Sequence, residues 1–561
     1  MGLVQATGAQ AYAKCKRHIH DSRCYGLVLT GSASYLRMGT MILIHPPVAK
    51  ACEPPAGITK LAGFLDANGV DCLLLDLNLE GTLHLLETSV AKSDTWTKRA
   101  VRNVSRNLNA LRDWQLFKNH DRYKRAVMDL NRILTAHGQE TGCHLSLSDY
   151  QQETLSPLRS RDLLWSAEHP DADPFYSYFS GRLRAVAGRT ADRVIGFSLN
   201  YLSQALPTFS MLGFLRRAFP SLRLVLGGGL VTSWLQKPDW KNLFCGLVDE
   251  VVSGPGEYPL LRILGKSLIS SGNALPRFSG LPLREYLSPG LILPYATSSG
   301  CYWGRCSFCP ERAEGNQYCP IAPDLVVKQL QSLAGETRPE LVHLVDNAIS
   351  PALMERMARP EGLVRAGPNT GESPATPWYG FARITRHLTD PEFCRNLKAS
   401  GCVMLKLGLE SADQDLLDAM QKGHDVGTSR LCLSALKQAG ISTYVYLLFG
   451  TPQETEASAR ATLEFVAQEA EQIDFLNLAL FNLPVASPDA HLLQTRPFFD
   501  GDLSLYTDFV HPAGWERRRV RQFLESEFRR HPAVQKILRN HPPLFTSNHA
   551  PLFAIKADRC A

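Results

Sequence analysis

Three cysteines fall within nine residues in the segment Gly300-Cys301-Tyr302-Trp303-Gly304-Arg305-Cys306-Ser307-Phe308-Cys309. Thiolates this close together can face one metal centre, because Gly300 and Gly304 allow the backbone to turn tightly. No fourth cysteine follows at an equivalent spacing. Three protein ligands on a [4Fe–4S] cluster leave one iron open to a further ligand, whereas a structural zinc site requires four ligands. The alternative that stays open is a zinc site completed by a nearby group such as Cys319.

Length and composition place the chain among ordinary globular proteins with several domains. Its 561 residues would make about three or four typical domains. Hydrophobic residues make up 44% and charged residues 20%, and no apolar run approaches the ~18 residues that a membrane span requires. The 14 cysteines show no disulfide-like framework, which suits a reducing compartment, so we expect a cytoplasmic protein. The net charge of +6 is mild and gives no reason to expect a nucleic acid partner.

Residues 38–264 have the pattern of a doubly wound, Rossmann-like α/β domain, preceded by an extension, residues 1–37, that we expect to be flexible. Continuous apolar runs separated by helical stretches indicate strands buried on both faces of a parallel sheet. These runs lie at residues 42–44, 70–77, 193–201, 222–226 and 248–253. Glycines follow the last two strands, at Gly227, Gly228, Gly229, Gly254 and Gly256. They would let the backbone approach a bulky ligand at the carboxyl ends of the strands.

A helical insertion, residues 82–190, separates the two halves of this domain. Between Lys98 and Arg132 it carries ten Lys or Arg against three Asp, interleaved with aromatic residues. Such a run is most often a solvated helical face, although the same pattern could grip an anionic or nucleic-acid partner. Because the insertion lies inside the first domain, it is also a candidate lid or substrate-selecting element.

A Pro-, Gly- and Ser-rich linker, residues 265–290, leads into a second domain, residues 291–489. Its apolar strands are expected at residues 291–295, 341–345, 378–384, 402–409, 441–449 and 475–481. Six such βα units with polar residues at the strand ends predict a partial (β/α)6 barrel of TIM type, with its chemistry in the carboxyl-end loops. Residues 490–561 no longer show this alternation of apolar strands and helices. We expect them to form a tail region that packs across the barrel mouth.

The Cys-x4-Cys-x2-Cys spacing, with the aromatic Phe308 before the last cysteine, resembles the cluster loop of radical S-adenosylmethionine (SAM) enzymes. Most members have three residues in the first gap, and the longer gap here is similar to that of relatives with an N-terminal cobalamin-binding domain. Two further segments resemble the fourth- and fifth-strand regions of such cobalamin-type barrels. They are Leu407-Gly408-Leu409-Glu410-Ser411, followed by Leu416, Met420 and Lys422-Gly423, and Phe449-Gly450-Thr451-Pro452-Gln453-Glu454-Thr455.

The resemblance implies that Cys301, Cys306 and Cys309 hold a [4Fe–4S] cluster whose open iron binds SAM, which is then cleaved reductively to a 5′-deoxyadenosyl radical. The implied SAM-binding residues are Phe308 over the adenine, Asp346 facing the amino group, Arg383 near the carboxylate, Glu410 and Ser411 near the ribose, and Gly450 in the fifth-strand turn. The implied partners are a reductant such as flavodoxin or ferredoxin and a small-molecule or peptide substrate.

The first domain resembles the cobalamin-binding domain that precedes the barrel in this class, with the glycines named above at the cobalamin site. The Asp-x-His-x-x-Gly motif that supplies an axial histidine in many cobalamin proteins does not occur in it. Either cobalt binds without a protein histidine, or the domain has lost the cofactor and serves substrate binding or an interface. We therefore expect an enzyme that activates an unreactive C–H bond, with a corrin as methyl donor or redox partner. The alternatives are SAM cleavage without cobalamin and a non-catalytic Fe–S or zinc protein.

Overall fold

The structure is a computed structural model. It describes residues 41–560 apart from 91–93, 189–193, 238, 271, 363, 366–373 and 499, and it does not describe the side chains of residues 556–560. The predicted flexible extension, residues 1–37, lies outside the described residues.

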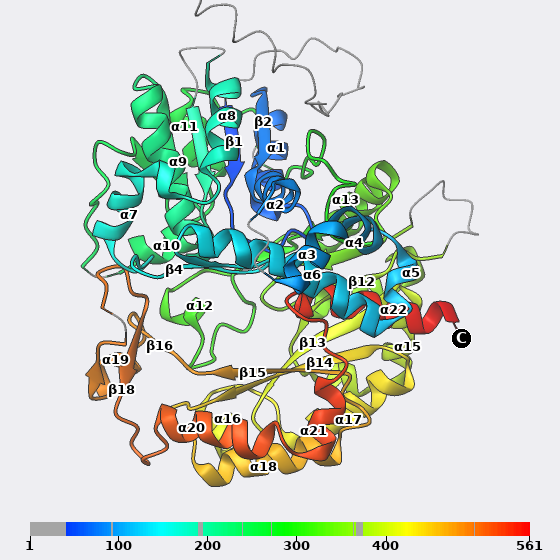
Figure 1. Cartoon of the computed structure of the whole chain (residues 1–561). Helices are drawn as coiled ribbons and strands as arrows, with labels where there is room; N and C mark the ends of the chain where they lie inside the picture. Colours follow the sequence, from blue (N-terminus) through cyan, green and yellow to red (C-terminus); the bar gives the residue numbers. More distant parts are fainter. Residues whose placement is uncertain are drawn as a thin grey trace, which may run out of the picture. The chain divides into compact units, whose positions relative to one another are not determined.

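Five parallel strands form the first sheet, in the order β2-β1-β5-β6-β7 (Figure 1). They are β1 (Met41–His45), β2 (Cys72–Asp76), β5 (Val194–Ser198), β6 (Arg223–Gly227) and β7 (Glu250–Val251). All five residues of β1 are buried, as expected for a central strand with both faces covered. The strand order reverses between β1 and β5, and a doubly wound sheet opens its ligand crevice there, beyond the carboxyl ends of the strands. The predicted Rossmann-like fold is confirmed.

Helices connect the strands of this sheet. They are α1 (Ala56–Ala67) after β1, α9 (Leu202–Ala218) after β5, α10 (Gly229–Leu235) after β6 and α11 (Glu257–Ile263) after β7. Between β2 and β5 lie α2 (Leu77–Glu87), α3 (Thr95–Arg102), α4 (Val104–Leu111), α5 (Trp114–Phe117), α6 (His120–Glu140), β3 (Cys143–Leu145), β4 (Tyr150–Gln152), α7 (Ser160–Glu168), η1 (Pro170–Ala172) and α8 (Tyr176–Ala187). The insertion is therefore mainly helical, as predicted, and it also contains the antiparallel hairpin β3–β4. Part of its basic stripe is neutralised, since Arg99 pairs with Asp129 at 2.6 Å and Arg112 with Glu285 at 2.9 Å.

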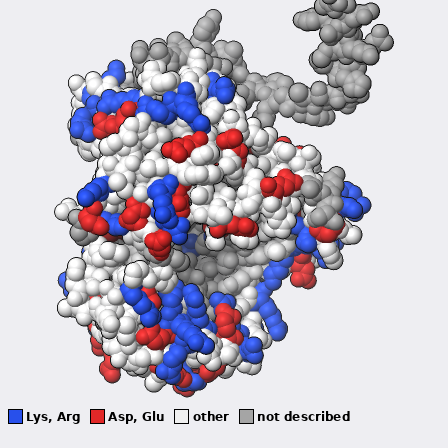
Figure 2. All heavy atoms as spheres, turned by 60° about the vertical axis from the view of Figure 1, so that its left-hand side comes forward, with Lys and Arg blue, Asp and Glu red and all other residues white. Residues whose placement is uncertain are grey.

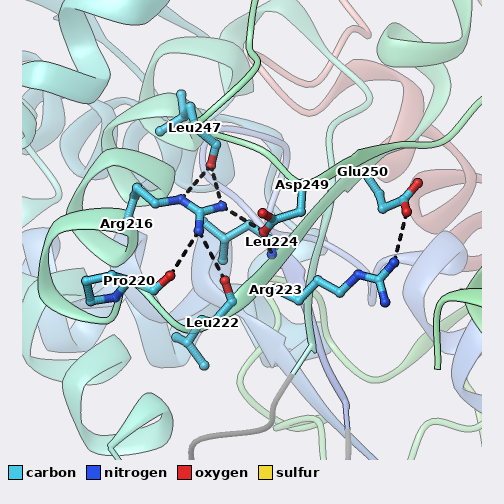
Figure 3. Close-up of polar contacts among 8 residues, drawn as sticks. All are labelled: Arg216, Pro220, Leu222, Arg223, Leu224, Leu247, Asp249 and Glu250. Atoms are coloured by element: carbon cyan, nitrogen blue, oxygen red, sulfur yellow. Dashed lines mark hydrogen bonds and ion pairs between the residues drawn. The ribbon is translucent and has the colours of Figure 1, made fainter. Parts of the chain in front are cut away.

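A polar clamp fixes the amino ends of β6 and β7 (Figure 3). Arg216 of α9 pairs with Asp249 at 2.7 Å, and Asp249 in turn accepts a hydrogen bond from the backbone N–H of Leu224 at 2.7 Å. The same guanidinium donates to three backbone carbonyl oxygens, those of Pro220, Leu222 and Leu247. Bonds from a charged donor are the stronger class of protein hydrogen bond. This end of the sheet is thus held by side chains, and it is opposite to the ligand crevice.

Six parallel strands form the second sheet, in the order β15-β14-β13-β12-β11-β8 (Figure 1). They are β8 (Ile292–Tyr295), β11 (Leu341–Leu344), β12 (Trp378–Ala382), β13 (Cys402–Glu410), β14 (Ser442–Phe449) and β15 (Phe475–Leu480). The elements between them are β9 (Ser298–Ser299), α12 (Pro310–Ala313), β10 (Cys319–Pro320), α13 (Pro323–Thr337), α14 (Pro351–Met357), η2 (Pro360–Gly362), η3 (Arg386–Thr389), α15 (Pro391–Ala399), α16 (Gln414–Ala419), α17 (Val426–Gln438) and α18 (Glu456–Gln468). Among the described residues β8 and β15 do not pair with each other, so the barrel is open on one side. The predicted partial (β/α)6 barrel is confirmed.

Alternate residues of the barrel strands belong to two different hydrophobic cores, because successive side chains of a strand point to opposite faces. On β14, Val445 and Leu447 join the core between the strands and the outer helices. Tyr444 joins a second core, which covers the concave face of the barrel and continues into the first domain through residues such as Phe117 and Leu206. The concave face of the barrel is therefore packed against the first domain.

The linker and the tail take part in these cores. In the linker, the hydroxyl of Tyr286 donates to Asp76 at 2.8 Å, and the N–H of Leu287 donates to the carbonyl of Ala51 at 2.8 Å. The tail region contains β16 (Leu483–Pro484), α19 (Asp489–Leu492), β17 (Thr495–Arg496), β18 (Tyr506–Phe509), α20 (Arg517–Phe523), η4 (Leu524–Phe528), α21 (Pro532–Leu538) and α22 (Thr546–Cys560). Helix α21 packs on α18 and β15, whereas α22 contacts β13 and α5. The tail therefore covers much more of the molecule than the barrel mouth.

Charge on the face in Figure 2 is mixed, with Lys and Arg gathered most densely over its lower part. Helix α20, at the lower edge of Figure 1, contributes Arg519, which pairs with Glu456 at 3.0 Å. Arg496 of β17 pairs with both Asp508 and Glu516. Such pairing reduces the net field that a polyanion would meet. Within the described ranges, no helix is both long and apolar enough to cross a membrane.

Candidate functional site

The cysteine segment lies in a loop that leaves the carboxyl end of β8 and is closed at its base by the pairing of β9 with β10. Gly300 and Gly304 have φ of +69° and +59°, as the predicted tight turns require. A Cβ on Gly300 would lie 2.4 Å from the carbonyl oxygen of Gln317 on the returning arm of the loop. Glycine at this position thus allows the two arms of the loop to approach each other.

The three cysteines differ in their surroundings. Cys306 is buried, while Cys301 and Cys309 are half-buried, and burial raises the pKa of Cys309 to about 11. A buried thiolate needs a compensating positive charge, which the iron of a cluster would supply. Across the part of the chain that the structure describes, no three His, Cys, Asp or Glu side chains converge on a single-ion site. Each thiolate of a [4Fe–4S] cluster binds a different iron, and three cysteines in one loop suit that ligand set.

A turn after α16 holds the cysteine loop in place. The N–H of Ser307 donates to the carbonyl of Met420 at 3.0 Å, and the indole N–H of Trp303 donates to the carbonyl of Gln421 at 2.9 Å. Gly423 has φ of +77°, and a Cβ there would lie 2.2 Å from the Trp303 ring. The resemblance between residues 416–423 and the family pattern therefore has a physical basis, because this turn is the support of the cluster loop.

Arg383, at the carboxyl end of β12, lies against the same loop. Its guanidinium is buried, with Nη1 3.5 Å from Sγ of Cys306, and it stacks on Trp303 at 4.2 Å from the ring centroid. It also donates to the carbonyl of Lys422. Cation–π stacking and the carbonyl contact fix a positive charge beside the cysteines. Arg383 is thus in direct contact with the cluster loop.

Glu410 and Phe308 meet through one lysine. The ammonium of Lys422 lies 2.7 Å from Oε1 of Glu410 and 5.5 Å from the centroid of the Phe308 ring. Both members of the ion pair are largely buried, and Glu410 has a φ of +67° at the end of β13. A non-glycine residue in this conformation is strained and is common at functional sites. The structure therefore brings Phe308, Arg383 and Glu410 together around the cysteine loop.

Asp346 lies at the base of the loop. Its Oδ1 accepts hydrogen bonds from the hydroxyls of Thr297 at 2.8 Å and Ser298 at 2.6 Å, and from the N–H of Thr297 at 3.1 Å. Burial raises the pKa of this carboxyl group, while the hydrogen bonds act in the opposite direction. Asp346 thus ties the end of β11 to the segment that leads into the cysteines.

Ser411 and Gly450 contact the segment around α18 rather than the cysteine loop. Ser411 is fully buried, and its hydroxyl is 3.2 Å from that of Thr462 on α18. Gly450 has φ of +83°, and its N–H donates to the buried carboxyl group of Glu454, which also accepts from the indole of Trp515 at 3.0 Å. Their observed contacts are with α18 and with the tail.

A cavity of 790 Å³ joins the crevice of the first sheet to the cysteine loop. Eight of its lining residues are glycines, among them all five that were predicted from the sequence: Gly227, Gly228, Gly229, Gly254 and Gly256. The opposite wall includes Ser299 and Gly300 of the cluster loop, and Leu505 and Tyr506 of the tail also line the cavity. Its volume lies towards the upper end of the range for ligand pockets, roughly 300–1,000 Å³. The five predicted glycines of the first domain and the two arms of the cluster loop therefore border one space.

The glycines serve this cavity in different ways. Gly228 has φ of +112°, and a Cβ there would lie 2.4 Å from the carbonyl oxygen of Leu199, so a side chain would collide with the backbone of the sheet rather than with a ligand. Gly254 has no atom within 4 Å of an added Cβ, and Gly229 meets only Asn200, at 3.7 Å. These open positions are a cradle that a side chain would fill, which fits a large planar ligand. No histidine occurs among the described residues that line the cavity.

Sequence reasoning missed several residues of this site. Tyr506 reaches the cavity from the tail, and Gln236 donates to Asn316 of the cluster loop at 3.2 Å, bridging the two domains. Trp303 lies in the cysteine segment and Lys422 in the fourth-strand segment that resembles the family. Their positions in these two motifs could have placed them near the cysteines. Tyr506 and Gln236 had no such signal, since neither belongs to a motif or to a periodic stretch.

Comparison with known proteins identifies related sequences. Residues 295–466 match the Radical SAM superfamily. Tryptophan 2-C-methyltransferase of Streptomyces laurentii is 25% identical over 219 residues, which is 37% of this chain and 36% of that protein. Bacteriochlorophyllide d C-12(1)-methyltransferase of Chlorobaculum tepidum is 27% identical over 193 residues, which is 33% of this chain and 40% of that protein. The matched regions thus span well under half of either relative.

A solved structure extends the likeness to the first domain. It is that of TsrM from Kitasatospora setae, a radical S-adenosylmethionine methyltransferase with cobalamin and a [4Fe–4S] cluster bound. The two structures align with a TM-score of 0.50 at 17% identity, over 87% of this chain and 82% of that one. At this identity the likeness concerns the fold, and it includes both the doubly wound sheet and the barrel.

Proposed function

We propose that this chain, whose residues 295–466 form a radical SAM domain, is a cobalamin-dependent radical SAM methyltransferase. One observation carries the proposal. The glycine crevice of the first sheet and the cysteine loop of the second are walls of the same 790 Å³ cavity. A ligand in the crevice and a cluster in the loop would therefore act on one enclosed substrate. The names of the two related methyltransferases support the same reaction class.

The chain's residues suit the predicted cofactors, which are a [4Fe–4S] cluster, SAM and cobalamin. We assign the cluster to Cys301, Cys306 and Cys309, SAM to the barrel mouth beside Arg383 and Glu410, and cobalamin to the glycine-lined cavity. When bound, these cofactors supply reductive SAM cleavage and a corrin that carries a methyl group. Because no histidine lines the cavity among the described residues, we infer that cobalt is held there without an imidazole ligand.

The protein's own side chains would bind SAM and orient it. We assign Arg383 to the SAM carboxylate, where it would also keep a positive charge beside Cys306. We assign Glu410 to the ribose, and Lys422 would hold its carboxylate in place, because moving it away would break a largely buried ion pair. The carboxylate of Asp346 is occupied by Thr297 and Ser298, so any contact with the SAM amino group would add to its role in holding the loop. Ser411 positions the turn that carries Glu410.

Enclosure is the second contribution of the protein. A radical abstracts hydrogen from whichever donor reaches it first, so its surroundings must exclude water and other donors. Phe308 packs against a small apolar cluster of Phe481, Leu483 and Phe509, which the end of the barrel and the tail provide. The substrate, a small molecule or a peptide, would lie between the crevice and the loop. A flavodoxin- or ferredoxin-type reductant would supply the electron.

The test is anaerobic reconstitution of the full chain with iron, sulfide and cobalamin, followed by addition of SAM and titanium(III) citrate. We expect bound iron, bound cobalt and a SAM-derived product, either 5′-deoxyadenosine or S-adenosylhomocysteine, detected by mass spectrometry. Product without retained cobalt would favour a radical SAM enzyme that has lost cobalamin. Retained metal without either product would favour a non-catalytic Fe–S or zinc protein, and the proposal would then be rejected.

A further inference from the structure

A second cavity lies on the open side of the barrel. It has a volume of 390 Å³ and lies between the edge strand β15, the tail and the loop that follows β1. Tyr444 and Tyr446 of β14 form its aromatic wall, with ring centroids 5.0 Å apart. Asn477 of β15 lies beside Tyr446 in the register of the sheet. The cavity therefore reaches the concave face of the barrel from the side, away from the cysteine loop.

The charge of this cavity is positive. Lys50 and Arg529 line it, and none of its described lining residues is Asp or Glu. Lys50 donates to the hydroxyl of Ser547 at 3.1 Å; burial lowers the pKa of Lys50, and the carboxylate of Glu53, which does not line the cavity, opposes this shift. Arg529 pairs at 3.2 Å with the exposed Glu525 of its own segment. His541 adds no charge, since burial lowers its pKa to about 4 and its Nε2 accepts a hydrogen bond from the N–H of Leu476. Two cations thus face a polar space that contains no protein carboxylate.

Polar and aromatic side chains are packed between this cavity and the first domain. Burial lowers the pKa of Lys406 on β13 to about 8, the Glu53 carboxylate opposes this shift, and the charge of Lys50 adds to it. The Lys406 ammonium lies 4.8 Å from the centroid of Tyr379, and His343 stacks on the same ring at 4.3 Å. Glu53, from the loop after β1, lies 3.0 Å from Nδ1 of His343. Tyr379 and Lys406 are buried, so these side chains belong to the packing between the concave face of the barrel and the first domain.

We propose that the 390 Å³ cavity is a substrate subsite for an anionic group, a carboxylate or a phosphate, held by Lys50 and Arg529. This inference rests on the proposed function, because only an enzyme has a substrate. Anion binding itself needs no cofactor. Arg suits this task because its planar fork matches both carboxylate and phosphate oxygens.

Four probes of equal size and different charge test the subsite: benzoate, phenyl phosphate, benzyl alcohol and benzylamine. Equilibrium dialysis against the full chain should show binding of the two anions and at least ~10-fold weaker binding of the alcohol and the amine. Tighter binding of benzoate would indicate a carboxylate substrate, and tighter binding of phenyl phosphate a phosphorylated one. Equal binding of all four probes would overturn the proposal.

Matched variants locate the site. Lys50→Gln and Arg529→Gln should each weaken anion binding about 10-fold, while Arg530→Gln, which changes the exposed neighbour outside the cavity, should leave it unchanged. Unchanged binding in both cavity variants would overturn the assignment. Iron and cobalt content of the same variants should stay at the wild-type level. If the wild-type chain bound neither anion but kept both metals and formed a SAM-derived product, the subsite would be rejected and the proposed function would stand. If the wild-type chain bound the anions but formed no SAM-derived product, the proposed function would be rejected and the anion site would stand.

Discussion

The two cavities of this chain are built from different materials. Eight glycines line the 790 Å³ cavity, together with charged side chains such as Lys60 and Glu311, whereas the described lining of the 390 Å³ cavity has no glycine and includes Lys50, Arg529 and two tyrosines. Where glycine lines a site, the ligand meets the backbone directly and is recognised there by shape. A site made of buried side chains recognises charge, and its members must be paired or bind a ligand. The first should therefore respond to added volume and the second to lost charge.

The largest effect is expected where side chains alone make the site. Cys306→Ala should abolish iron binding, since a [4Fe–4S] cluster with one open iron needs all three thiolates. Cys319→Ala is the matched control, because Cys319 is exposed and lies in β10 at the base of the loop. Iron and sulfide analysis after reconstitution measures both. Equal loss in the two variants would indicate a site with four cysteine ligands.

Removal of one partner of the buried ion pair should have the next largest effect. Lys422→Met leaves Glu410 charged and unpaired, which should lower the free energy of unfolding by about 3–5 kcal/mol. The double change Glu410→Met with Lys422→Met should recover part of this loss. Lys437→Met, which breaks an exposed pair with Asp474, should cost only ~0–1 kcal/mol. Urea unfolding would measure all three, and equal costs for the two single changes would contradict the distinction between buried and exposed charge.

Added volume should damage the backbone-built cavity. Gly228→Val places a branched side chain at a φ of +112°, against the backbone of Leu199, so we expect a loss of about 2–4 kcal/mol in unfolding free energy together with reduced cobalt binding. Gly229→Ala, with 3.7 Å to its nearest neighbour, should cost within about 1 kcal/mol. The iron content should not change. Equal cobalt binding in wild type and Gly228→Val would remove this crevice from the cobalamin site.

The smallest change in any one step is a dependence of stability on pH. Burial raises the pKa of Glu454 from 4.5 to about 8, so the folded chain binds a proton that the unfolded chain has lost between these values. Stability from this group is present below pH 4.5 and is lost as the pH rises towards 8, by about 1.4 kcal/mol per pH unit. In Glu454→Gln the free energy of unfolding should depend less on pH. Urea unfolding at several pH values measures it, and parallel curves for the two proteins would show that Glu454 ionises normally.

The strands of both sheets could be predicted from the sequence because each is a continuous apolar run, and periodicity is a local signal. The three cysteines and the five glycines were likewise visible as local patterns. The reason for Gly228 was not the expected one, since its missing side chain makes room for Leu199 rather than for a ligand. Only coordinates could place a neighbouring strand end next to that glycine.

The residues that the sequence did not reveal are those whose partners lie far along the chain. Glu53 and His343 are 290 positions apart, and neither belongs to a motif. Lys406 occurs in an otherwise apolar strand, where it could have been noticed as a buried charge, but its partners could not be inferred. Long-range polar networks depend on how two domains pack, and that packing leaves no periodic trace in either segment.

The C-terminal helix α22 has a consequence for the order in which the protein can form during synthesis. His549, next to its start, is 2.6 Å from the hydroxyl of Tyr123, a residue 426 positions earlier, and Phe545 and Leu552 belong to the same core as the first strands. A ribosome adds residues from the amino end, and domains usually fold as they emerge. Here the core of the first domain stays open until residues 545–552 have left the exit tunnel. The nascent chain therefore keeps the apolar surface that these residues cover exposed throughout the translation of the barrel.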